Sequence, residues 1–119
     1  MGVMYYAEYL HLFERARNEF IRRAGMSYAE VEHRGVILPV REATCRYRSP
    51  ARYDDLLLVH IGLAEIRRAS LRFVYEIMPI DKSRTLAEGM TQHAIVNRDL
   101  KPMAAPKWFL EVLTAKVEN

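Results

Sequence analysis

A change in the spacing of apolar residues near Gly35 constrains the fold of this chain more than any other feature of its sequence. Before that glycine, apolar side chains recur every three or four residues, at Tyr5, Tyr9, Phe13, Ala16, Phe20 and Ala24. This spacing places them on one side of an α-helix. We therefore predict an amphipathic helix of about five turns that ends at Gly25.

A short second helix is predicted directly after it. Ser27 and Glu30 have the spacing of a capping box, in which each side chain binds a free backbone N–H at the helix start. This helix would run from Tyr28 to about Arg34. Beyond Gly35 apolar and polar residues alternate, first over residues 43–48, and a period of two is typical of a strand with one covered face.

Three further strands are predicted over residues 56–66, 70–77 and 86–96, and a terminal helix over 107–116. The connections at 67–69 and 79–83 are short enough for hairpins, so we expect an antiparallel meander. One long helix followed by strands is typical of an α+β domain, in which the helix covers one face of the sheet. A length of 119 residues fits a single domain over residues 1–119.

Charge and cysteine content narrow the function classes. The chain has 18 Lys and Arg against 15 Asp and Glu, an excess that suits a small anionic ligand but predicts no nucleic-acid partner. No apolar run approaches the roughly 20 residues that span a bilayer. Cys45 is the single cysteine, so a reducing cytoplasm is expected, and a structural thiol is favoured over a reactive one.

Four ordered motifs carry a resemblance to a known family. They lie at residues 2–10, 13–17, 25–28 and 47–55, and the segments 87–91 and 96–99 fit as well. Together they resemble the hot-dog-fold acyl-CoA thioesterases, in particular the 4-hydroxybenzoyl-CoA thioesterase and YbgC type. The resemblance extends over roughly residues 2–100. It implies a hot-dog fold, in which an antiparallel sheet wraps the long helix.

The resemblance also implies the position of the catalytic groups. The family's aspartate stands three residues before the glycine that matches Gly2, which lies upstream of Met1. We therefore expect Met1 to be an internal methionine of a longer natural protein whose first strand and aspartate loop precede it. The backbone N–H of Tyr6 is implied as the donor to the thioester oxygen. The substrate-binding residues implied by the first motif are Gly2, Val3, Tyr5 and Tyr9.

Three arginines beside the predicted hairpin offer a site for the phosphates of CoA, because guanidinium groups bind phosphate well. They are Arg67, Arg68 and Arg72. An exposed, solvated turn is the alternative interpretation. Glu14 is expected to pair with Arg17 or Arg41, and Asp54 and Asp55 to form turn hydrogen bonds.

The four histidines lack the spacing of a zinc site, so no metal is expected, and no cofactor besides the CoA of the substrate. His93 is interpreted as a hydrogen-bonded histidine of the sheet rather than a ligand-binding one.

Two functions remain open at this point. The first is an acyl-CoA thioesterase that hydrolyses a fatty or aromatic acyl-CoA as a homodimer or homotetramer. Each of its sites would combine the helix start of one subunit with strands of its neighbour, as the resemblance implies. The alternative is a non-catalytic hot-dog domain that binds acyl-CoA or acyl carrier protein.

Overall fold

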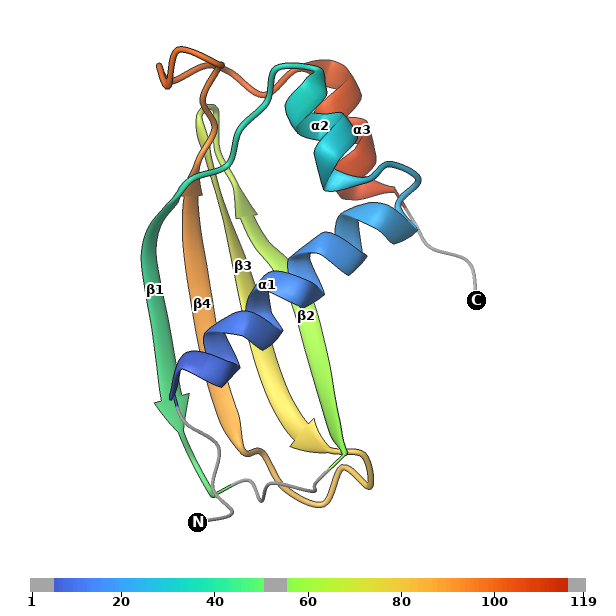
Figure 1. Cartoon of the computed structure of the whole chain (residues 1–119), viewed down its shortest axis with the longest axis vertical. Coiled ribbons are helices and arrows are strands. Elements are labelled where there is room, and N and C mark those ends of the chain that lie inside the picture. Colours follow the sequence, from blue (N-terminus) through green and yellow to red (C-terminus); the bar gives the residue numbers. More distant parts are fainter. Residues whose placement is uncertain (1–5, 51–55, 116–119) are drawn as a thin grey trace.

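The computed structural model describes residues 6–50 and 56–115. The elements in chain order are α1 (Tyr6–Arg23), α2 (Tyr28–His33), β1 (Val40–Tyr47), β2 (Leu57–Ile66), β3 (Ser70–Pro79), β4 (Ala87–Ala94) and α3 (Lys107–Thr114). All strand pairs are antiparallel, and α1 crosses one face of the sheet (Figure 1). The predicted α+β architecture is therefore confirmed.

The two predicted helix ends are confirmed by their backbone geometry. Gly25 has a φ of +114° and Gly35 a φ of +94°, a region that side chains with a Cβ rarely adopt. At the start of α2 the Ser27 Oγ accepts a hydrogen bond of 3.1 Å from the Glu30 N–H. This is the first half of the predicted capping box.

The order of the strands differs from the predicted meander. The sheet order is β1-β4-β3-β2, so β2, β3 and β4 form a meander but β1 lies beside β4 at the far edge. The Arg67–Ala69 connection is a hairpin, as predicted, and the Arg67 N–H donates to the Ser70 carbonyl at 2.8 Å. The meander prediction is wrong for β1 because period-two spacing shows that a segment is a strand but not which strand it pairs with.

The core lies between α1 and the sheet face that it crosses. The buried residues of α1 are Tyr9, Phe13 and Ile21, and those of β3 on the same face are Leu71, Phe73, Tyr75 and Ile77. The buried stripe of α1 thus ends on Ile21, which is 2% exposed, whereas the predicted Ala24 is only half-buried. In the part of the chain that the structure describes, no element covers the opposite face, where Val74 is 41% exposed (Figure 1).

The predicted terminal helix is confirmed as α3, which lies beside α2 beyond the carboxyl end of α1 (Figure 1). Its residues Phe109 and Leu113 are buried in the core. The Arg34 guanidinium lies over the Trp108 ring at 5.2 Å and joins α2 to α3. Among the described helices, none is long and apolar enough to cross a membrane.

Candidate functional site

The first turn of α1 lies at the carboxyl end of β1 (Figure 1). Tyr9 is 1% exposed, and its ring centroid lies 5.3 Å from that of Tyr47, the last residue of β1. The first four backbone N–H groups of a helix have no partner within the helix, and they carry the positive end of the helix dipole. The contact between the two tyrosines therefore holds the first turn, with its N–H groups that have no partner within the helix, against the end of the sheet.

A close contact one turn further along sets the height of α1 above the sheet. The Phe13 ring stacks on the Tyr75 ring with centroids 4.2 Å apart and an interplanar angle of 13°. Beneath it lies Gly89 of β4, where a Cβ would stand 2.5 Å from the Phe13 ring and 2.4 Å from the Thr44 carbonyl oxygen. The glycine is thus required by space, and it lets the aromatic ring rest on the backbone of β4.

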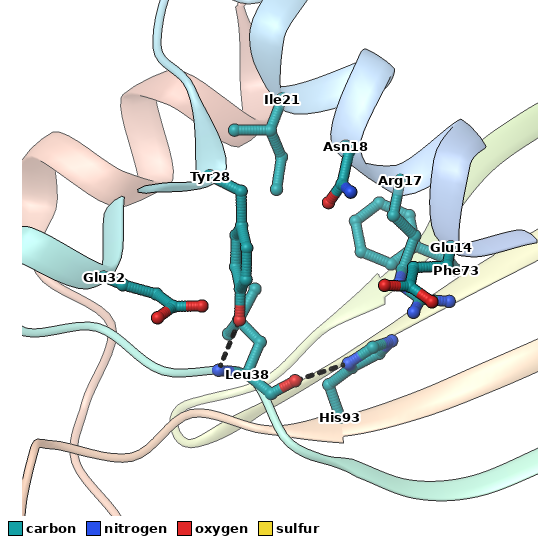
Figure 2. A pocket seen from close by; sticks show the side chains of 9 residues that line it. All are labelled: Glu14, Arg17, Asn18, Ile21, Tyr28, Glu32, Leu38, Phe73 and His93. Atoms are coloured by element: carbon teal, nitrogen blue, oxygen red, sulfur yellow. Dashed lines mark hydrogen bonds between the residues drawn. The ribbon is translucent and has the colours of Figure 1, made fainter. Parts of the chain in front are cut away.

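A second place of interest is a pocket of about 240 Å³ between α1, α2 and the sheet, which we call the polar pocket (Figure 2). Charged, polar and apolar side chains from these elements line it: Glu14, Arg17, Asn18, Ile21, Tyr28, Glu32, Leu38, Phe73 and His93. The Leu38 N–H donates to the Tyr28 hydroxyl at 3.2 Å, and the Leu38 carbonyl contacts His93 (Figure 2). The pocket therefore joins the two helices to the strand that follows them.

A continuous row of hydrogen bonds, called the relay below, leads from this pocket into the sheet; it is part-buried at Arg17 and buried beyond it. Arg17 Nη1 donates to the Tyr75 hydroxyl at 3.1 Å, which lies 2.6 Å from Thr91 Oγ1. Thr91 Oγ1 in turn lies 2.8 Å from His93 Nε2, and His93 Nδ1 lies 3.0 Å from the Leu38 carbonyl oxygen. Thr91 and His93 are 2% and 1% exposed. The relay accounts for every buried side-chain polar atom on its path.

Burial changes the acid-base properties of these groups. Desolvation lowers the pKa of His93; the hydrogen bond to Leu38 opposes the shift, and the charge of Arg17 adds to it. Desolvation raises the pKa of Tyr75, although its hydrogen bonds with Arg17 and Thr91 act in the other direction. Burial therefore favours the neutral form of His93, and its two hydrogen bonds confirm the prediction of a hydrogen-bonded sheet histidine.

The structure places the residues predicted for the substrate site in separate regions. Tyr6 is the first residue of α1 and Tyr9 lies in the core, whereas the predictions for Gly2, Val3 and Tyr5 lie outside the described residues. The predictions for Asp54 and Asp55 also lie outside them.

The three arginines lie far from the helix start. Arg67 and Arg68 occupy the β2–β3 hairpin at the opposite end of the sheet (Figure 1). Through Ala87 of β4, Tyr47 lies level with Ile77 of β3. Ser70, at the hairpin end of β3, is seven residues from Ile77, which is about 23 Å at 3.3 Å per residue. Arg67 pairs with Glu65, and Arg72 Nε donates to Gln92 at 2.8 Å. One chain alone therefore does not bring these arginines to the start of α1.

The structure also tests the predictions made for Glu14 and Cys45. Glu14 lines the polar pocket, but among the described residues no ion pair joins it to Arg17 or Arg41, so the predicted pairing is not formed. Cys45 is half-buried opposite Gly89, and desolvation raises its pKa, which is the behaviour of a structural thiol. Within the described ranges, no three His, Cys, Asp or Glu side chains group as a metal site would require.

Sequence reasoning missed Arg17, Tyr75 and Thr91 as members of one polar group. A signal for Arg17 was present, because it stands four residues after Phe13 and four before Ile21, on the buried stripe of the helix. A charged residue at such a position needs a buried partner. No pattern in the sequence names that partner.

Comparison with known proteins agrees with this architecture. A family model described as the thioesterase-like superfamily matches residues 1–113. The acyl-CoA thioester hydrolase YbgC of Escherichia coli is 31% identical over 106 residues, 89% of this chain and 79% of that protein.

Solved structures give the same result. A crystal structure of a protein from Aquifex aeolicus has a TM-score of 0.87 and 34% identity, covering 95% of this chain and 87% of that one. The DHNA-CoA thioesterase of Staphylococcus aureus has a TM-score of 0.83 and 29% identity, covering 93% and 74%. The chain therefore belongs to the thioesterase-like superfamily, as a hot-dog thioesterase of the YbgC type.

Proposed function

We propose that this protein hydrolyses acyl-CoA thioesters, with the thioester carbonyl oxygen bound at the start of α1 by the backbone N–H of Tyr6. The observation that carries the proposal is the position of the first turn, which the Tyr9–Tyr47 contact fixes at the end of β1 in a hot-dog thioesterase fold. Water adds to the carbonyl carbon and gives up a proton, negative charge develops on the carbonyl oxygen, and the carbon–sulfur bond then breaks. The departing thiolate takes up a proton, so that the products are the acid and free CoA. Free N–H groups and the helix dipole stabilise that charge.

The names of two relatives support the proposed substrate class. The Escherichia coli relative is named for acyl-CoA and the Staphylococcus aureus enzyme for DHNA-CoA, so a fatty or an aromatic acyl group fits the proposal. Gly2, Val3 and Tyr5 are the proposed contacts of the acyl thioester, and the fourth predicted residue, Tyr9, is buried in the core and would act by positioning the first turn.

Of the three arginines proposed to bind phosphate, Arg68 is the most available. Among the described residues no acid pairs with Arg68, whereas Arg67 and Arg72 both lie near Glu65. The arginines lie far from the start of α1. One substrate molecule therefore reaches the arginines and the helix start together only by extending along the sheet or by lying across two subunits.

We further propose that two copies form the working unit. Among the described strands β1 has a hydrogen-bonding partner on one side only, which is β4, and most of its residues are exposed. A free edge of this kind pairs readily with another strand. Antiparallel pairing of two β1 strands about a twofold axis would set the start of one β1 beside the helix start of the other copy. Contact between the uncovered sheet faces would convert two such dimers into a tetramer.

A proline at the first helical position gives a sharp test of the proposed donor. Tyr6→Pro removes the N–H, yet proline is tolerated there because that N–H has no helical partner. Tyr6→Phe keeps the N–H and is the matched control. Removing one such donor is expected to lower kcat roughly 100- to 1000-fold, while the Phe variant hydrolyses at the wild-type rate. Release of CoA from a panel of acyl-CoAs is followed with a thiol reagent.

The assay is run on the chain of residues 1–119 and on a form extended upstream in its reading frame. Acyl carrier protein thioesters serve as a second panel of substrates. Equal rates for the Pro and Phe variants would refute the role of the N–H. If either form binds acyl-CoA or acyl carrier protein and neither form hydrolyses a thioester, the enzyme proposal is wrong and the protein is a non-catalytic binding domain.

A further inference from the structure

The relay has a fixed direction because its two ends have fixed roles. A guanidinium group only donates hydrogen bonds, so Arg17 donates to the Tyr75 hydroxyl. A backbone carbonyl only accepts, so the Leu38 oxygen accepts from His93 Nδ1–H. These two ends determine the hydrogen positions on every group between them.

The tautomer of His93 follows from that direction. A neutral imidazole with its proton on Nδ1 has Nε2 as an acceptor. Thr91 therefore donates its hydroxyl proton to His93 Nε2 across 2.8 Å. Since Thr91 donates there, its oxygen accepts the Tyr75 proton across 2.6 Å. Each hydroxyl thus accepts once and donates once, and no donor in the relay is left without an acceptor.

A proton added to His93 disrupts this arrangement. Nε2 would become a second donor aimed at Thr91, whose own proton would then lose its acceptor or have to turn toward the Tyr75 oxygen. That oxygen already accepts from Arg17, and the Tyr75 proton would lose its acceptor. A buried donor without a partner is unfavourable, and the new charge would also face the Arg17 cation.

The groups that face His93 from neighbouring elements do not offset this effect. From α1 they are Arg17 and Glu14, from α2 they are Tyr28 and Glu32, and from β3 it is Tyr75. The two glutamates are exposed at the rim of the polar pocket, where water screens their attraction for a buried charge. Val40, which pairs with His93 from β1, and Leu38 carry no titratable side chain.

The relay ends at the segment that leads into β1. The Leu38 carbonyl accepts from His93, and the next carbonyl, that of Pro39, accepts from the Ala94 N–H at 3.2 Å. Val40 then begins β1 opposite His93. Among the described residues β1 pairs with β4 alone, so this contact and the Ile37–Val96 bridge just before it hold its start.

We infer that the relay is a pH-sensitive latch, in which neutral His93 holds the start of β1 against β4 and protonation of His93 releases it. The sign follows from linkage. An unfolded chain binds the histidine proton with a pKa of about 6.5, and burial lowers the pKa in the folded protein. The stability that the latch contributes is therefore complete above pH 6.5 and is lost as the pH falls from there to the lowered pKa of the folded protein, where His93 takes up its proton and the latch opens. In that window the unfolding constant rises by up to about tenfold per pH unit for this one proton.

The first test reads the tautomer directly. Nitrogen-15 NMR of the imidazole ring in the wild-type protein is expected to show a proton on Nδ1 and none on Nε2 of His93 at pH 7.5. Titration of the same signals is expected to begin below pH 6.5. A proton on Nε2 at pH 7.5, or titration at or above 6.5, would overturn the inference without any variant.

The second test measures the consequence. Unfolding by urea is followed from pH 8 to pH 5 in the wild type, in His93→Gln and in His60→Gln, the last being an exposed histidine of β2 as the matched control. The wild type and the His60 variant should lose stability with acid in parallel, and the His93 variant should lose less. Equal pH dependence in all three would overturn the latch. If the His93 variant does not fold, the wild-type NMR titration decides.

Hydrogen exchange locates the release. The Ala94 N–H, bonded to Pro39, reports the start of β1, and the Leu86 N–H, bonded to Ile77 at 2.8 Å, reports the far end of the sheet. After correction for the intrinsic rates, acid should speed exchange at Ala94 more than at Leu86. Equal acceleration at both sites would refute a local release.

Discussion

Replacing Gly89 by alanine tests the packing that sets α1 above the sheet. An added Cβ would stand 2.4 Å from the Thr44 carbonyl oxygen and 2.5 to 2.6 Å from two atoms of the Phe13 ring. Separations this short do not occur in packed proteins, and the carbonyl belongs to the backbone of β1, which cannot turn away as a side chain does. The helix, the strand or both must therefore move.

We expect this substitution to cost about 2 to 3 kcal/mol, the upper part of the range for overpacked cores. For a chain of 119 residues this corresponds to a Tm lower by roughly 10 °C. Urea and thermal unfolding measure the loss. Because Phe13 lies on the same helix as the proposed oxyanion donor, the rate of acyl-CoA hydrolysis should fall as well.

Gly62→Ala is the matched control, since a Cβ there would meet only the Val74 Cγ2 atom, at an ordinary 3.6 Å. It should change stability by less than about 0.5 kcal/mol. A double-mutant cycle with Phe13→Leu separates the ring from the carbonyl, and part of the cost of Gly89→Ala should disappear in that background. If Gly89→Ala is no more destabilising than Gly62→Ala, the close-packing argument is wrong.

Three further changes test other parts of the fold. Ser27→Ala removes the acceptor of the Glu30 N–H and should cost about 1 kcal/mol by urea unfolding, while Ser27→Asp should retain most of the stability. Phe109→Ala empties a fully buried position of α3 and should cost about 3 to 5 kcal/mol, so a loss below 1 kcal/mol would show that α3 is not part of the core. Cys45 should react with iodoacetamide more slowly in the folded protein than in urea at pH 8, because burial raises its pKa and lowers the thiolate fraction. Equal rates in both states would contradict that assignment.

Local elements were predictable from the sequence because their signals are local. The three- and four-residue spacing from Tyr9 onward, the Ser27 cap and the two glycines with positive φ all act within a few residues. The pairing of β1 with β4 was not predictable in the same way. Tyr47 and Ala87 are neighbours in the sheet but lie 40 positions apart in the chain, and nothing in either strand names the other.

The same difference between local and long-range signals applies to the site. The resemblance predicts a donor at the start of the long helix; Tyr6 does begin α1, and the role of its N–H stays a prediction. The relay could not be predicted because its members come from α1, β3, β4 and the segment before β1, and each residue alone has an ordinary explanation. Thr91 and His93 share a face because they stand two residues apart on β4, whereas only the register of β3 against β4 brings Tyr75 to them.

The position of β1 at the edge has a consequence for the order of events during synthesis. Val40 pairs with His93 and Tyr47 with Ala87, so β1 leaves the ribosome well before its hydrogen-bonding neighbour exists. The β2–β3–β4 hairpins close over short stretches of chain, whereas pairing β1 with β4 must close a loop of at least 40 residues. Closing the longer loop loses more conformational entropy and is slower. A nascent chain that stalls before β4 emerges therefore carries an exposed strand without its native neighbour. Binding by chaperones, which would keep that strand from pairing with other chains, would matter most in that interval.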